Sequence, residues 1–233
     1  CTLRGLNLEA ALAVSPPRSD FRIALSFLLS FTPLREPLLR SLHEVLAAPA
    51  GATPTFSERI TIERLRVEAL IHASQARGTE AAACASAAVQ RAEQSRDDLL
   101  RLYSLLALQI VRITRDEYQA VLAVSQSMEV LATQAGNPAY LALALAGQGG
   151  ALLRQGHFLA ADAVLERAGA IPASTLGPII EALVQGLRAL CAHRRGDQAR
   201  AEALAAAALQ AVAHARFELA DLRFPLACVL EVY

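Results

Sequence analysis

The sequence predicts an all-α fold in which antiparallel helix hairpins stack into an α–α superhelix. Apolar residues recur three and four positions apart in almost every window, as on the buried face of a helix. The helix-favouring residues Ala, Leu, Arg, Glu and Gln dominate, and the alternation typical of strands is nearly absent. Pro and Gly interrupt this pattern often enough to cut the chain into about a dozen helices.

The stretch APAGATP, residues 48–54, divides the chain into two parts. Before it, residues 1–53 predict an irregular N-terminal segment of short helices. After it, Thr55 and Glu58 form a capping-box pattern that opens a helix. Residues 54–233 are therefore predicted to form a regular helical array.

Four similar stretches predict the bends of successive hairpins. They are RGTEAAACASA from Arg77, RDEYQAVLAVS from Arg115, QGHFLAADAVL from Gln155 and RGDQARAEALA from Arg195. The expected bends lie near Gly78, Asp116, Gly156 and Gly196, so they recur at nearly even intervals. Self-similarity at such a period indicates a solenoid, in which each hairpin buries its apolar face against its neighbours.

Small or compact residues follow each predicted bend at the same distance. We expect the second helix of a hairpin to lie close to the first at these positions, because close approach requires a short side chain. Gly149, seven residues before its bend, is expected at the same kind of contact, whereas Asp162 is expected on the exposed side. The four positions, five residues after the predicted bends, are Ala83, Val121, Ala161 and Ala201.

The third and fourth hairpins resemble the tetratricopeptide repeat, and this resemblance implies that the superhelix is right-handed. The resemblance covers roughly residues 57–212, with departures in the period, which is longer than the family's, and at Gln90 and Met128, where the family prefers alanine. Long alanine-rich repeats are similar to the arrays of large bacterial ATP-dependent regulators of the maltose-activator type, and of related signalling ATPases and adenylate cyclases. The matching residues are Gly149, Leu152, Gly156, Phe158, Ala161, Leu165 and Ala168, then Ala189, Gly196, Ala201 and Ala208.

The resemblance implies a binding surface, because the first helix of each tetratricopeptide hairpin lines the concave face. An apolar strip with polar anchors suits a peptide, an amphipathic helix or a small effector. Its leucines have a second interpretation, as core between repeats: Leu65, Leu106, Leu143, Leu153 and Leu190, alongside Ile110. The polar and aromatic residues predicted to bind are Glu68, His72, Gln75, Tyr103, Arg154, His193 and Arg194.

No motif predicts catalysis, a cofactor or a metal. The four cysteines are far apart, and the sequence contains no phosphate-binding loop, GxSxG or HExxH. His157 is expected at an exposed bend, with Asp162 and Glu166 on the following helix. The alternative is an all-helical enzyme or metal-dependent hydrolase that uses residues from the set His72, Cys84, His157 and His193.

Composition favours an interaction module. Twenty-two acidic residues balance 22 basic ones, which disfavours nucleic acid as a partner. No apolar run reaches the roughly 18 residues that span a membrane, and the cysteine pattern suggests the cytoplasm. We expect a fragment of a longer bacterial regulator that binds a protein, peptide or effector and that could self-associate; a lipoprotein scaffold acylated at Cys1 is a further alternative.

Overall fold

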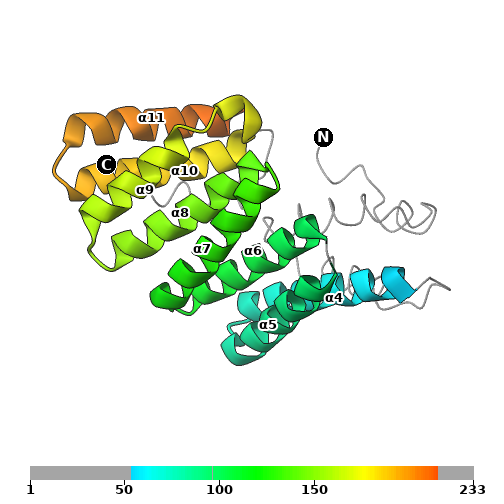
Figure 1. Cartoon of the computed structure of the whole chain (residues 1–233). Helices are drawn as coiled ribbons and strands as arrows, with labels where there is room; N and C mark the ends of the chain where they lie inside the picture. The colour runs from blue at the N-terminus through cyan, green and yellow to red at the C-terminus, as the bar shows by residue number, and fades with distance from the viewer. Residues whose placement is uncertain (1–53, 96, 215–233) are drawn as a thin grey trace. The chain divides into compact units, whose positions relative to one another are not determined.

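The computed structural model describes residues 54–95 and 97–214, and these are all-α. Within them, eight α-helices and one short 3₁₀ turn follow one another, with no strand (Figure 1). None of these helices combines the length and apolar character that crossing a membrane requires. The expected N-terminal segment, residues 1–53, lies outside the described residues. The helices are α4 (Pro54–Ser74), α5 (Gly78–Gln94), α6 (Asp98–Thr114), α7 (Tyr118–Gln134), α8 (Pro138–Arg154), α9 (Phe158–Gly169), α10 (Pro178–Arg194) and α11 (Gln198–His214).

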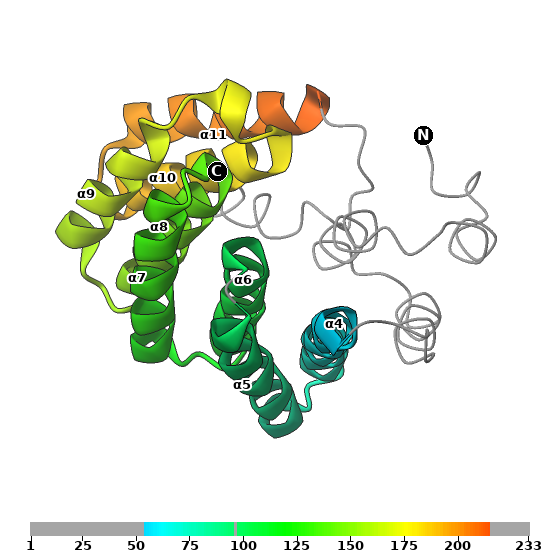
Figure 2. The same ribbon diagram turned by 45° about the vertical axis from the view of Figure 1, so that its right-hand side comes forward.

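The chain forms two compact units, divided after Val111 within α6. In the first unit, α4 and α5 pack against each other as a hairpin (Figure 2). In the second unit, α8 packs against α7, α9 and α10, and α11 packs against α10. These contacts confirm the predicted architecture of successive helix hairpins.

The helices from α5 onward are evenly spaced along the chain, because each begins at the same interval after the start of the one before it. All of them except α9 are 17 residues long. A helix of this length extends about 25 Å, so neighbours can pack along their whole extent. The exception is α9, which begins at the expected interval, at Phe158, but ends early, at Gly169. The 3₁₀ turn Ala173–Thr175 then leads to α10.

One residue in the left-handed conformation ends the first helix of each hairpin. These residues are Ala76, Asp116, Gly156 and Gly196, with φ between 55° and 82°, and they are evenly spaced along the chain. The next amide donates to a carbonyl five positions earlier, at 2.9 Å for His157 N and Leu152 O. This bond satisfies a carbonyl that the helix end would otherwise leave unpaired.

The first bend is therefore centred on Ala76, and the prediction of Gly78 was wrong by two positions. Gly78 is the first residue of α5. Glycine is favoured in the left-handed conformation, but other residues can adopt it at a cost of roughly 1–2 kcal/mol. Here the bend's hydrogen bond, Arg77 N to His72 O at 2.9 Å, offsets part of that cost.

The second helix of each hairpin buries a narrow stripe. Its fourth, eighth and eleventh residues are buried, while most of the residues between them are exposed or half-buried. The first helices are enclosed on more sides, and residues 142–149 of α8 are all buried. The stripe consists of Ala81, Ala85 and Ala88 in α5, Val121, Ser125 and Met128 in α7, Ala161, Leu165 and Ala168 in α9, and Ala201, Ala205 and Ala208 in α11.

This stripe confirms three of the four predicted close positions. Val121, Ala161 and Ala201 are fully buried. Ala83 is exposed, and Ala81 takes the equivalent place in α5. The shift by two positions has the same origin as the error at the first bend.

Gly149 of α8 lies at the closest approach between α8 and α9. A Cβ atom at this position would lie 2.5 Å from Cγ and Cδ2 of Leu165. Leu165 is itself fully buried and cannot move aside cheaply. At the neighbouring Gly150, a Cβ atom would lie 3.8 Å from Leu187 Cδ2, which is an ordinary contact.

These two adjacent glycines predict opposite effects of the same substitution. Gly149→Ala should lower the free energy of unfolding by about 1–3 kcal/mol, because overpacking outweighs the helix propensity gained. Gly150→Ala should leave it unchanged or raise it by up to about 1 kcal/mol. Urea titrations at constant slope measure both effects. Equal effects of the two substitutions would rule out a tight contact at Gly149.

Candidate functional site

In the first unit, a polar cluster joins α4 to α6, and it includes the predicted binding residue Tyr103. The guanidinium carbon of Arg66 lies 5.2 Å from the centroid of the Tyr103 ring. Arg66 Nε and Nη2 donate to Glu63 Oε2 at 3.1 and 2.9 Å. Arg59 pairs with Asp97, just before α6, at 3.2 Å. We call these five residues the α4–α6 cluster.

The α4–α6 cluster is strongly charged, with a buried centre at Glu63, Arg66 and Tyr103 and half-buried Arg59 and Asp97 at its edge. Glu63 and Arg66 are 3% and 1% exposed. Burial raises the pKa of Tyr103, Arg66 opposes this rise and Glu63 adds to it, so the phenol stays neutral at physiological pH. Among the described residues, Glu63 Oε1 has no hydrogen-bond partner. A buried unpaired acceptor costs about 1–3 kcal/mol, so the cluster is less stabilising than its ion pairs alone suggest.

Three other predicted residues lie on α4 or just after it, away from the cluster. Glu68 faces α5, where its Oε2 lies 4.0 Å from Cys84 Sγ. His72 is half-buried, and Gln75 is exposed beyond the end of α4. The structure therefore brings Tyr103 together with Glu63 and Arg66 rather than with Glu68 and His72.

The same misplacement by two positions explains this difference. Counted back by one repeat, Tyr103 and Leu106 are equivalent to Glu63 and Arg66. A repeat aligned on Gly78 predicts Leu65 and Glu68 instead. The even spacing of Asp116, Gly156 and Gly196, extended back by one repeat, predicts Glu63 and Arg66.

In the second unit, the predicted residues lie at the ends of two neighbouring helices. Arg154 and Arg194 are the last residues of α8 and α10, which pack against each other, and both are exposed. They occupy equivalent positions in successive repeats. His193 is half-buried, and its Nδ1 lies 3.1 Å from Gln198 Oε1. The structure thus brings two guanidinium groups to the same end of this unit.

The predicted strip of leucines divides by burial. Leu106, Leu143, Leu153 and Leu190 are between 2% and 8% exposed, which supports their interpretation as core. Leu65 is half-buried and packs against the core cluster of α4, α5 and α6. Ile110 is also half-buried. Recognition by this surface would therefore depend mainly on its polar residues.

The polar stretch after Gly156 forms ion pairs between helices. Asp162 pairs with Arg195 and, at 3.3 Å, with Arg200, and Glu166 pairs with Arg200 and, at 3.1 Å, with Arg188. The expectation that Asp162 lies on an exposed face was wrong, because its side chain is 17% exposed and joins α9 to α11. These carboxylates pair with arginine rather than with a reactive group.

His157 and the two described thiols lack the surroundings of a reactive site. His157 is exposed at the N-terminal end of α9. Burial raises the pKa of Cys191 and of Cys84, and the Glu68 carboxylate raises that of Cys84 further. A raised pKa reduces the thiolate fraction and so disfavours nucleophilic attack. Across residues 54–95 and 97–214, no three His, Cys, Asp or Glu side chains group closely enough to hold a metal ion.

Comparisons with known proteins do not assign this chain to a family. No protein-family model matches the sequence, and a search of the curated proteins finds no similar protein. Function must therefore be inferred from the hairpins and from the side chains that they present.

Because Glu63 and Arg66 form a buried pair, we expect substitution of Arg66 to lower the free energy of unfolding far more than substitution of an exposed arginine. Arg66→Met leaves Glu63 buried and unpaired, and should lower the free energy of unfolding by about 3–5 kcal/mol. Arg91→Met breaks an exposed pair with Glu58, whose side chains are 47% and 43% exposed, and should cost less than about 1 kcal/mol. Chemical denaturation measures both changes. Similar losses for the two variants would show that Glu63 and Arg66 are not a buried pair.

Proposed function

We propose that this chain is a non-catalytic interaction or effector-sensing module within a larger bacterial transcriptional or signalling regulator. In this proposal it is a tetratricopeptide-like array that binds a protein, a peptide or a small effector through the first helices of its hairpins. The observation that carries the proposal is the recurrence of one hairpin geometry, whose left-handed bend residues follow one another at even intervals from Ala76 to Gly196. Such arrays present equivalent side chains at regular intervals, which suits the recognition of extended partners.

The ends of α8 and α10 are the most accessible part of the proposed surface. Arg154 and Arg194 are exposed there at equivalent positions, and His193 lies beside them. Guanidinium groups pair with carboxylates in a bidentate geometry, so an acidic segment of a partner is the best match for this end. The buried leucines beneath provide a rigid platform for these side chains.

The surroundings of the titratable groups also support binding rather than catalysis. Asp162 and Glu166 serve as ion-pair partners between helices. Cys84 and Cys191 are free thiols with raised pKa values, which agrees with a structural role in a reducing compartment such as the cytoplasm.

Site-specific photo-crosslinking in the native host tests the proposed surface. A photoreactive amino acid in place of Arg154 or Arg194 should yield crosslinks to one discrete partner. In place of Val130 or Leu159, which are 58% and 75% exposed on second helices, it should yield none. Arg154→Glu combined with Arg194→Glu should reduce partner recovery if that partner is acidic there. Crosslinks that come equally from all four positions, or from Val130 and Leu159 alone, would contradict the proposed surface.

A further inference from the structure

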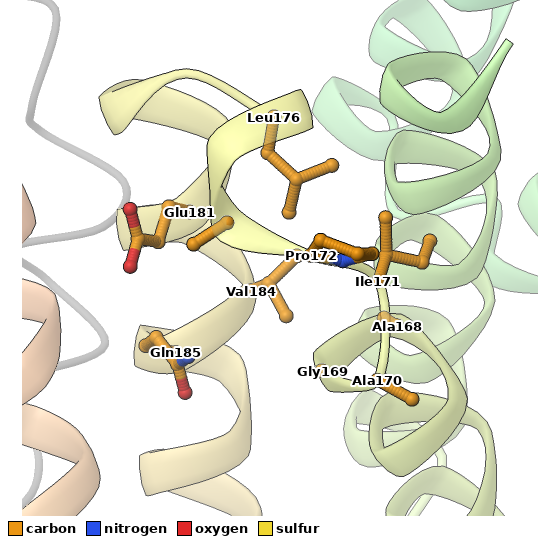
Figure 3. A pocket seen from close by; sticks show the side chains of 10 residues that line it. Ala168, Gly169, Ala170, Ile171, Pro172, Leu176, Glu181, Val184 and Gln185 are labelled. Carbon is orange, nitrogen blue, oxygen red and sulfur yellow. The ribbon is translucent and has the colours of Figure 1, made fainter.

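The early end of α9 leaves space beside α10. In α5 and α7, the helix continues past the stripe and buries one more alanine, Ala92 or Ala132. The chain of α9 instead leaves the helix at Gly169 and reaches α10 through the turn Ala173–Thr175. A hollow of about 180 Å³ lies between this connection and the first half of α10 (Figure 3). The hollow lies at the connection between the third hairpin, α8–α9, and the fourth, α10–α11.

Eight of the ten residues that line the hollow have an apolar side chain or none, but polar and apolar atoms face the hollow in similar proportion. Ile171 and Pro172 lie on one side, Val184 and the polar residues Glu181 and Gln185 lie on the α10 side, and Leu176 lies at one end (Figure 3). An engineered apolar cavity of about 150 Å³ can hold benzene, so this volume suits one six-membered ring. The hollow therefore has the size and the mixed lining of a site for a small molecule with one apolar part and one polar part.

Gly169 shapes the wall of the hollow next to Arg188. A Cβ atom on Gly169 would lie 2.5 Å from Arg188 Nη1, so a side chain here would displace the Arg188 guanidinium. Arg188 donates through Nη1 to Gln185 Oε1 at 3.0 Å and through Nη2 to Glu166 at 3.1 Å. Arg188 therefore shares Glu166 with Arg200, and its hydrogen bond to Gln185 holds that side chain in place.

The electrostatics of the hollow favour a cation. Glu181 is the one charged side chain among the ten residues that line it. The carbonyl end of α9, at Ala168, Gly169 and Ala170, adds partial negative charge on the opposite side. An ammonium group or another nitrogen donor is therefore the best polar match for a ligand whose body fills the apolar space.

We propose that this hollow binds a small amine whose apolar body is about the size of one six-membered ring and whose ammonium group pairs with Glu181. The proposal is independent of the partner surface described above, because Arg154, His193 and Arg194 do not line the hollow. In a sensor, such a ligand would act where α9 connects to α10, and the two sites can be tested separately.

Titration of the full chain with benzylammonium tests the ligand class. Methyl NMR signals of Ile171, Leu176 and Val184 should shift in a saturable manner, with a dissociation constant in the millimolar range or below. Benzyl alcohol, which has the same ring without the charge, should bind about three- to tenfold more weakly, as expected when one partly exposed ion pair is lost. Benzoate should bind more weakly still. Equal binding of the three probes, or the absence of saturable shifts with benzylammonium, would overturn the proposal.

Three variants locate the binding in the hollow. Glu181→Gln should weaken benzylammonium by about three- to tenfold and leave benzyl alcohol unchanged. Glu202→Gln, an exposed position on α11 outside the hollow, is the matched control and should have no effect. Ala170→Leu should abolish binding of both probes by filling the space, and it should fold because Ala170 is exposed and in the αR conformation. Retained binding in a folded Ala170→Leu protein, or equal effects of the two glutamate variants, would exclude this site.

Discussion

The close packing of a second helix against the first helix of its hairpin, as in α4–α5, α8–α9 and α10–α11, is the constraint on which the rest of this structure depends. The fourth position of the second helix is always small or compact, and alanine fills most of the fourth, eighth and eleventh positions. Alanine has almost no side-chain entropy to lose on burial, so it lets two helices approach at little cost. It also buries little area, so each hairpin must obtain further burial from its neighbours.

This constraint links local sequence to the regular spacing of the array. Helices of equal length, joined by short connections, repeat at a fixed interval, and this places the bend residues at even spacing along the chain. A shorter helix could not bury both the full stripe and the further alanine that follows it, such as Ala92 or Ala132. The short helix α9 lacks that further buried alanine. Where it stops at Gly169, the chain needs the Ala173–Thr175 turn to reach α10, and a hollow remains.

Much of the fold could be predicted because helix periodicity and bend chemistry are local properties. The bends at Asp116, Gly156 and Gly196 lie where the repeat placed them. The first bend differs from its prediction because glycine chemistry favours Gly78, whereas the bend uses Ala76. At this position the spacing between bends predicts the bend better than the residue type does. Helix length sets the position of the bend, and a single glycine does not.

The candidate site was harder to predict because it depends on contacts between distant residues. Tyr103 was identified, but Glu63 and Arg66 were not, since charged residues are usually exposed and the sequence does not show that these two are buried. The ion pairs of Asp162 with Arg195 and Arg200 join residues far apart in the sequence, and they exist because α9, α10 and α11 pack together. The local periodicity of the sequence cannot predict which distant side chains will form such ion pairs.

The most direct test of the hairpin packing is a comparison of Ala81→Leu with Ala83→Leu in α5. Ala81 is fully buried against the first helix and Ala83 is exposed, so the two substitutions add the same atoms to opposite sides of one helix. If the described packing is correct, Ala81→Leu lowers the free energy of unfolding by about 1–3 kcal/mol, whereas Ala83→Leu changes it by less than about 0.5 kcal/mol. The opposite order, measured by denaturant titration at constant slope, would contradict both the register of the first hairpin and the even spacing of the array.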